Sequence, residues 1–255
     1  TGIWQTVWLE FVPRMYLKSV QVTTDYRMGS VTFLATVNEL PKALTLRTSI
    51  SFDGKPCASF ETPLSAGGTI YTMQVGDVKC WDILQPNLYD VTYELLDGNA
   101  VIDTVQSYFG FRTVELREHS LWLNGRPIFQ RLVLDQGYYP DGVYTAPTDA
   151  DLKRDIELSI ALGFNGARLH QKVFEERFLY WADRLGYLVW GEQASWGLDI
   201  TTSEGLINFL PEWLEVVARD RNHPSIIGWC PFNETWDQGR RRADKRVLEA
   251  VYLTT

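Results

Sequence analysis

Asn233 and Glu234, near the carboxyl end of the chain, have the residue types and the position needed for acid–base chemistry on a hydroxylated substrate. They directly follow residues 226–231, an apolar run that predicts a buried strand. In parallel sheets flanked by helices, catalytic side chains lie at the carboxyl ends of the strands. The glutamate is therefore placed for proton transfer and the amide for holding a hydroxyl group. The alternative interpretation is a strand-end glutamate in a surface salt bridge beside a loop-capping asparagine.

Earlier predicted strands end in further polar residues. Asp135 follows the first of them, Arg168 and His170 the second, and Glu192 the third. Because an arginine at a buried strand end is costly without a partner, we expect Arg168 to pair with a carboxylate of the site. Asp135 either binds paired hydroxyl groups or bonds its own backbone in a turn. His170 and Glu192 either contact the ligand or support the structure around it.

Aromatic side chains accompany these candidates. Trp196 follows the third predicted strand and could stack on a ligand or close the core. Trp229, Phe232 and Trp236 could give Glu234 the apolar surroundings in which a carboxylic acid stays protonated near neutral pH. We therefore include Trp196 and Trp236 among the candidate binding residues.

The composition restricts the function classes. A net charge of −8 over 255 residues argues against nucleic acid or an anionic membrane surface as a partner. The basic residues within 240–246 are interpreted as a solvated helix face. No apolar stretch reaches the ~20 residues of a membrane helix, so no membrane partner is expected. Three cysteines without a Cys-x-x-Cys pair argue against a disulfide framework and leave the localisation open.

Cofactor and metal signatures are missing from the sequence. The three histidines, at positions 119, 170 and 223, have no metal-ligand spacing, which predicts no metal. No glycine-rich phosphate loop follows a predicted strand, and no Gly-x-Ser-x-Gly elbow is present. We expect neither a cofactor nor a nucleophilic serine.

Residues 14–113 have the pattern of an antiparallel β-sandwich. Short alternating segments such as 31–37 are separated by turn signals, and Asp53-Gly54 and Asp97-Gly98 predict hairpin turns. No segment with helical periodicity interrupts them. As a strand, residues 1–13 would carry large apolar side chains on both faces. They are interpreted as the last strand of a preceding domain.

From residue 114 onward the pattern changes. The Asn-Gly turn within residues 121–128 predicts a hairpin, and strands then alternate with helices. Leu152, Ile156 and Ile160 form a helical core stripe, and Thr148 is a candidate N-cap. Four strand–helix units predict parallel pairing and amount to half of a (β/α)8 barrel. Because a half barrel leaves open parallel edges, we expect the natural protein to continue past residue 255.

The motifs resemble glycoside hydrolase family 2, the group of β-galactosidases, β-glucuronidases and β-mannosidases. The most specific match is the run 219–229 followed by Asn233 and Glu234, which resembles the acid/base signature of that family. The other matches are residues 1–9, 86–89 with 110–112, 124–128 and 182–189. The resemblance implies an N-terminal jelly-roll domain ending at residue 13, an immunoglobulin-like sandwich over 14–113, and the N-terminal half of a TIM barrel over 114–255.

The same resemblance implies a retaining exo-β-glycosidase that is β-galactosidase-like and acts on a carbohydrate substrate. Glu234 matches the acid/base residue, and Asn233 matches the residue that bonds the sugar 2-hydroxyl. The family nucleophile is a glutamate after the seventh strand, which these residues do not include, so the 255-residue chain alone is expected to be inactive. A non-catalytic carbohydrate-binding or scaffold protein is the alternative.

The sequence also departs from the best-known β-galactosidases. Residues 135–139 replace a histidine-rich segment, and residues 194–197 replace acidic and histidine ligands of Mg²⁺. The sugar that is cleaved and the oligomeric state, including a possible homo-oligomer, therefore stay open.

Overall fold

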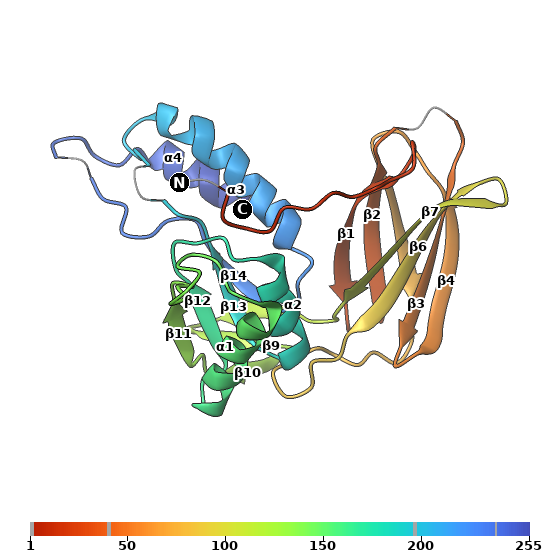
Figure 1. Ribbon diagram of the computed structural model, residues 1–255, viewed down its shortest axis with the longest axis horizontal. Coiled ribbons are helices and arrows are strands. Elements are labelled where there is room, and N and C mark those ends of the chain that lie inside the picture. Colours follow the sequence, from red (N-terminus) through yellow and green to blue (C-terminus); the bar gives the residue numbers. More distant parts are fainter. Residues whose placement is uncertain (1–2, 40–41, 196–197, 238) are drawn as a thin grey trace. The chain divides into compact units, whose positions relative to one another are not determined.

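The computed structural model describes residues 3–39, 42–195, 198–237 and 239–255 (Figure 1). The chain divides into two compact units. One unit is Thr6–Phe129, and the other is Gln130–Thr255 together with the described residues up to Gln5. The two units differ in architecture, since the first is built from antiparallel strands and the second from parallel strands with helices.

The first unit contains a β-sandwich. One sheet has the order β1-β2-β5 and the other the order β4-β3-β6-β7, and all pairs are antiparallel. Phe33 and Tyr93 meet edge to face in the core between them, with ring centroids 5.9 Å apart. The strands are β1 (Leu17–Asp25), β2 (Ser30–Val37), β3 (Thr45–Phe52), β4 (Lys55–Pro63), β5 (Thr69–Gln74), β6 (Tyr89–Asp97) and β7 (Ala100–Phe109).

The predicted hairpin turns are present. Asp53 and Gly54 join β3 to β4 with φ of 49° and 72°, the left-handed conformation that a two-residue hairpin of this type requires. Asn124 and Gly125, with φ of 52° and 75°, join β9 (Ser120–Leu123) to β10 (Arg126–Ile128). These hairpins set the registers of their strands.

A small sheet of order β10-β9-β8 follows the sandwich, with β8 spanning Val114–Arg117. It belongs to the first compact unit, so the two units divide after Phe129. The sequence analysis places the domain boundary after residue 113. The difference arises because Asn124 bonds residues of the sandwich unit, accepting from Thr113 N at 3.0 Å and donating to Trp81 O at 2.9 Å.

The described residues before Pro13 form no strand, unlike the strand that their alternation predicts. A strand needs a pairing partner for its backbone groups, and none of the described strands pairs with this segment. Ile3, Leu9 and Phe11 are accordingly 86%, 87% and 94% exposed.

The second unit is a parallel sheet of order β11-β12-β13-β14 with helices between its strands (Figure 1). Helix α1 contacts α2, and α3 contacts α4. The elements are β11 (Leu132–Asp135), α1 (Asp149–Ala161), β12 (Gly166–Leu169), α2 (Glu176–Leu185), β13 (Leu188–Glu192), α3 (Leu206–Asp220), β14 (Ile226–Cys230) and α4 (Lys245–Thr254), with a 3-10 turn at Ser203–Gly205.

Helix ends follow their capping residues. Thr148 caps α1 as predicted, with its side chain accepting from Asp151 N, and Gly186 ends α2 in the left-handed conformation. Asp244 caps α4 by accepting from Arg246 N at 2.9 Å. This cap starts the helix at Lys245, so the expectation that the whole basic cluster lies on a helix face is wrong.

One burial expectation in this unit is also wrong. Ile160 was expected in the core stripe of α1 but is 39% exposed, whereas Ser159 is buried and bonds Tyr187 at 2.7 Å. Leu134 is 57% exposed because β11 is an edge strand of the described sheet. No described helix is long and apolar enough to span a bilayer.

Candidate functional site

Five residues at the carboxyl ends of β12, β13 and β14 are joined in a closed ring of hydrogen bonds. Arg168 Nε donates to Glu192 Oε2 at 2.7 Å, and Arg168 Nη2 donates to Asn233 Oδ1 at 2.6 Å. Glu192 Oε1 accepts from Gln171 N at 2.9 Å, and Gln171 Oε1 accepts from Ser195 N at 3.1 Å. Asn233 N donates to Ser195 Oγ at 3.1 Å and closes the ring. Three strand ends are thereby held in one arrangement.

The carboxylate of this ring is fully buried. The side chain of Glu192 has no exposed area, and that of Arg168 is 33% exposed. A buried carboxylate needs a cation and hydrogen-bond donors. The Arg168 guanidinium supplies the cation, and both this group and the backbone N–H of Gln171 donate hydrogen bonds. The structure therefore gives Glu192 a role in holding its neighbours, while its role toward a ligand stays a prediction.

Two amide nitrogens of the ring have unused donor capacity. Asn233 Nδ2 and Gln171 Nε2 are buried, and neither has a hydrogen-bond partner among the described residues. An unsatisfied buried donor costs about 1–3 kcal/mol. Ligand hydroxyl groups would supply the acceptors that these two donors need.

Two strand ends carry left-handed non-glycine residues. Gln171 has φ of 55° after β12, and Glu234 has φ of 47° after β14. Such conformations cost about 1–3 kcal/mol for residues with a Cβ and cluster at functional sites. Both follow strands of the same parallel sheet, on either side of β13, which supports a site at this edge of the sheet.

Glu234 is exposed, which contradicts the expectation that it is buried. The reason is that β14 is an edge strand of the described sheet and the left-handed turn directs residue 234 away from the strand. Glu234 lines a hollow of about 440 Å³ together with Phe232 and Trp236. Trp236 is 72% exposed there.

The other predicted aromatic residues make core contacts. Trp229 packs edge to face on Trp213, with centroids 5.6 Å apart, and belongs to the core beneath the sheet end. Phe232 stacks on Phe209 at 5.7 Å. Trp196 lies outside the described residues.

His170 lines a second hollow of about 270 Å³. The loop between β11 and α1 supplies Gln136, Tyr138 and Tyr144 to its wall, and Gln171 of the ring lies on the same wall. The amide of Gln136 meets His170 Nδ1 at 3.2 Å. Aromatic faces next to amide and imidazole groups suit a ligand with apolar faces and hydroxyl edges.

Asp135 lies at the base of that loop. Its Oδ1 accepts from Gly137 N at 2.8 Å, which is the turn interaction that the sequence analysis left as an alternative. Burial, partly offset by this hydrogen bond, raises the pKa of Asp135. The structure therefore gives Asp135 a turn role, while its role toward a ligand stays a prediction.

The signature run before β14 forms a structural network. His223 Nδ1 lies 2.6 Å from Asp183 Oδ2, and Asp183 Oδ1 accepts from Ser225 N at 2.9 Å. Arg219 Nε and Nη2 contact the two Asp220 oxygens at 2.6 and 2.8 Å. Burial opposes the charge of His223, but the Asp183 carboxylate outweighs it and raises the pKa of His223. These bonds fix the start of β14 and hence the position of its carboxyl end.

Sequence reasoning missed three residues of this region. Gln171 and Ser195 complete the ring, and Lys172 is a buried cation beside it. Their positions in the sequence could have indicated them, because all three come shortly after a strand end at which a candidate residue was already predicted. No described group of three or more His, Cys, Asp or Glu side chains could hold a metal ion.

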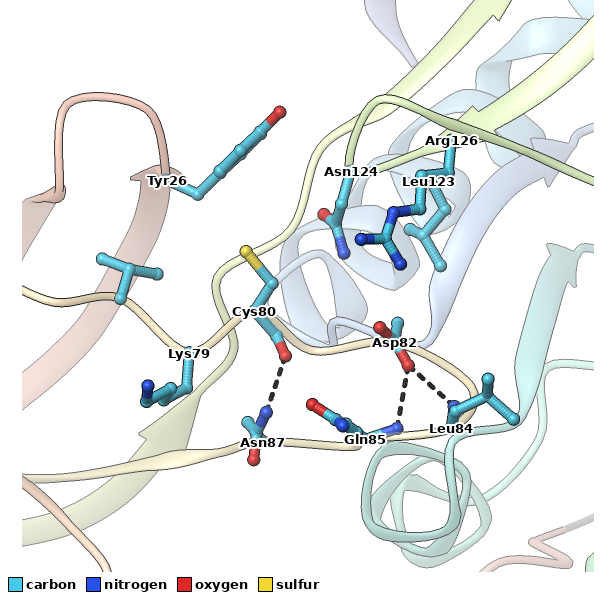
Figure 2. A pocket seen from close by; sticks show the side chains of 11 residues that line it. Tyr26, Lys79, Cys80, Asp82, Leu84, Gln85, Asn87, Leu123, Asn124 and Arg126 are labelled. Carbon is cyan, nitrogen blue, oxygen red and sulfur yellow. Dashed lines mark hydrogen bonds between the residues drawn. The ribbon is translucent and has the colours of Figure 1, made fainter.

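A separate hollow of about 490 Å³ lies in the first unit (Figure 2). Its walls are held by local bonds, since Asn87 Nδ2 donates to Cys80 O at 2.9 Å and Asp82 Oδ1 accepts from Leu84 N and Gln85 N. None of the sequence-predicted site residues lines it. The candidate site is therefore the edge of the parallel sheet.

An antiparallel sandwich followed by parallel β/α units defines a multidomain protein with part of an α/β barrel, and the candidate site lies at the strand ends of that part. Family models match the same two kinds of domain, with the change between them at residue 113 and not after Phe129. The description "Glycosyl hydrolases family 2" matches residues 15–112, and "Glycosyl hydrolases family 2, TIM barrel domain" matches residues 114–252. The chain belongs to glycosyl hydrolases family 2, with an immunoglobulin-like sandwich preceding part of the barrel.

The chain is also similar to curated proteins that are named as glycosidases. The chain is 28% identical over 242 residues to a putative beta-glucuronidase of Formosa agariphila, covering 92% of this chain and 29% of that protein. It is 28% identical over 260 residues to a beta-galactosidase of Vibrio vulnificus, covering 92% of this chain and 25% of that protein. The chain thus spans less than a third of each relative.

Solved structures show the same fold. The apo β-glucuronidase from Ruminococcus gnavus matches with a TM-score of 0.80 at 22% identity, covering 95% of this chain and 41% of that chain. The same enzyme in complex with D-glucuronic acid matches with a TM-score of 0.79.

Proposed function

We propose that the whole protein is a retaining exo-β-glycosidase, β-galactosidase-like, with Glu234 as its acid/base residue. The observation that carries this proposal is the hydrogen-bond ring, because it fixes Asn233 next to Glu234 at the barrel edge. In a retaining glycosidase one carboxyl group protonates the leaving oxygen and then activates water. The second carboxylate attacks the sugar, and we assign it to a residue outside residues 1–255.

The other candidates have supporting roles in this proposal. We assign to Asn233, whose buried Nδ2 has no hydrogen-bond partner among the described residues, the contact with the sugar 2-hydroxyl that strengthens in the transition state. Arg168 and Glu192 hold the Asn233 amide in that orientation. His170 lines the second hollow, which would take other hydroxyl groups, and Asp135 lies at the base of the loop that forms part of its wall. Trp236 provides an apolar face beside Glu234.

The test uses the full-length protein with Glu234→Gln. We expect turnover of natural β-linked disaccharides to fall by about 10²–10⁴-fold, because their leaving groups need protonation. Nitrophenyl glycosides, whose leaving groups need little protonation, should lose less. Glu212→Gln, an exposed change on α3, serves as the matched control and should leave both rates unchanged. Undiminished hydrolysis of disaccharides by Glu234→Gln would remove the residue from this role.

A panel of nitrophenyl galactosides, glucuronides, mannosides and glucosides identifies the sugar. The names of the two relatives above differ in the sugar, since one is called a putative beta-glucuronidase and the other a beta-galactosidase. If the full-length protein bound sugars but hydrolysed no member of the panel or natural oligosaccharide, a carbohydrate-binding protein that keeps the fold would replace the enzyme.

A further inference from the structure

Lys172 is a buried cation next to the candidate site, and its ammonium group bonds two carbonyl groups of one loop. The residue is 4% exposed. Its Nζ donates to Gly137 O at 2.7 Å and to Tyr144 O at 2.9 Å. These carbonyls lie near the two ends of residues 136–145, the loop that lines the hollow at His170. The lysine therefore joins both sides of that loop at one point.

Three aromatic rings surround the ammonium group. Lys172 Nζ lies 4.4 Å from the centroid of Tyr144, 4.8 Å from that of Trp4 and 4.8 Å from that of Phe174. Cation–π contacts of this kind are strongest where the cation is desolvated. Burial lowers the pKa of Lys172, although the carboxylates of Asp135 and Glu175 act in the opposite direction.

The tryptophan of this cage comes from the start of the chain and is held there by two hydrogen bonds. Gln5 Nε2 donates to Val173 O at 2.8 Å, and Thr145 Oγ1 donates to Trp4 O at 2.6 Å. The Trp4 ring meets Tyr144 edge to face with centroids 4.5 Å apart. Trp4 therefore encloses the same loop that Lys172 binds.

The loop backbone is fitted closely around the lysine. Gly137 has φ of 63°, and a Cβ there would lie 2.6 Å from Lys172 Nζ and 2.8 Å from Phe174 Cζ. Tyr138 is adjacent to this glycine and packs on Tyr144 with centroids 5.4 Å apart. Displacement of the ammonium group would consequently move the two tyrosines that line the hollow.

We propose that Lys172 is a positioning residue for the sugar-binding hollow. Its ammonium group, enclosed by Trp4, Tyr144 and Phe174, fixes the loop so that Gln136 and Tyr138 present their side chains to the ligand. The identity of the ligand as a sugar rests on the proposed function. The positioning itself rests on the contacts of Lys172 alone, so the two can be tested separately.

The first experiment measures the loop without using activity. In the full-length protein, Lys172→Met keeps a long apolar stem but removes the donors to both carbonyls. We expect faster hydrogen–deuterium exchange of the amides in residues 136–147, with unchanged protection of α3. Lys153→Met is the matched control, because Lys153 also lies over an aromatic ring, Trp181 at 5.1 Å, on the helix α1. Unchanged exchange in the loop of Lys172→Met would overturn the positioning role.

The second experiment measures the consequence for the substrate. On the glycoside that the panel identifies, Lys172→Met should raise KM by about tenfold or more and change kcat by less than about twofold, because the loop contributes binding and no reacting group. Lys153→Met should change neither. A variant with a mobile loop but an unchanged KM would overturn the link to the sugar.

A second variant covers the case in which Lys172→Met fails to fold. Trp4→Leu removes one ring of the cage. It keeps the ammonium group, and it keeps the backbone carbonyl of residue 4 that accepts a hydrogen bond from the Thr145 hydroxyl. We expect a smaller increase both in loop exchange and in KM, and no increase in either would overturn the proposal. If the unmodified protein hydrolyses no glycoside, the proposed function fails, and the exchange data alone decide the role of Lys172.

Discussion

The two compact units differ in how they treat buried polar groups. In the described sandwich unit the buried polar side chains are Thr48 and Thr69, which carry no charge. In the parallel unit the buried set includes four ionisable residues, and these are Lys172, Asp183, Glu192 and Asp220. Each of the four contacts an oppositely charged group or several hydrogen-bond partners.

Burial of charge is expensive and contributes little net stability compared with apolar packing. The sandwich core is formed by apolar and aromatic side chains such as Phe33, Tyr89 and Phe109. In the parallel unit, Lys172 and Glu192 lie where strands end and where the candidate site lies, whereas Asp183 and Asp220 lie in the network that fixes the start of β14. The difference indicates that the sandwich sequence serves folding, whereas part of the parallel unit serves the positions of particular side chains.

The largest expected effect comes from removing the cation of the ring. Arg168→Met leaves the carboxylate of Glu192 buried without its ion pair, so we expect a loss of about 3 kcal/mol in the free energy of unfolding. The matched change in the sandwich is Arg47→Met. Arg47 pairs with Glu61 and Glu94 on an exposed sheet face, where ion pairs contribute about 0–1 kcal/mol.

Denaturant titration followed by the fluorescence of each unit measures both variants. Equal losses for Arg168→Met and Arg47→Met would show that the two units tolerate charge equally. The proposed contrast between them would then be wrong.

A smaller effect is expected where the two units resemble each other. Each has a buried tyrosine hydroxyl bonded to one small hydroxyl, Thr48 with Tyr71 at 2.6 Å and Ser159 with Tyr187 at 2.7 Å. Burial raises the pKa of Tyr71 and of Tyr187 to about 12. Thr48→Val and Ser159→Ala should each cost about 1–2 kcal/mol, because each leaves a buried hydroxyl group without its partner.

Thermal unfolding with parallel chemical denaturation compares these two variants. A cost in one unit that exceeds the other by more than about 1 kcal/mol would show that neutral groups, and not charges, distinguish the units.

The smallest expected effect is a pH dependence specific to the parallel unit. The folded-state pKa of His223 is raised, so its protonated form stabilises the fold. This contribution is fully present below the unfolded pKa of about 6.5 and is lost as the pH rises through the higher folded value. The effect is moderate because neutral His223 can still hydrogen-bond Asp183.

Melting temperatures between pH 6 and 9 measure this dependence. His223→Gln should remove the decline above neutral pH, whereas His119→Gln, an exposed change in the first unit, should not alter it. If the melting temperature of His223→Gln declined by the same amount above neutral pH, titration of other groups would be the cause of the decline.

The sequence predicted the fold well where the signals are local. The hairpin at Asp53-Gly54 and the Thr148 cap each depend on the conformational preferences of one or two residues. The periodicity of α1 was less reliable, since Ile160 is exposed and Ser159 takes the inward position to reach Tyr187. Residues 3–13 show the limit of alternation, because a strand requires a partner as well as a pattern.

The site was predicted only as a set of strand ends. Adjacent ends of a parallel sheet meet at one edge, so Arg168, Glu192 and Asn233 could be grouped from the order of the strands. The ring also needs Gln171 and Ser195, whose contacts depend on a left-handed residue and a loop path that no periodicity indicates. The exposure of Glu234 was missed because an apolar run gives no information on the turn that follows it.

The cage around Lys172 has a consequence for anyone who expresses part of this protein. A fragment that starts at Leu17, where the first sandwich strand begins, would omit Trp4 and Gln5. The barrel portion of such a fragment could still fold, yet its ammonium group would face water on one side. Its tyrosine wall would then be looser than in the intact chain, and weak sugar binding by the fragment would reflect the choice of its first residue.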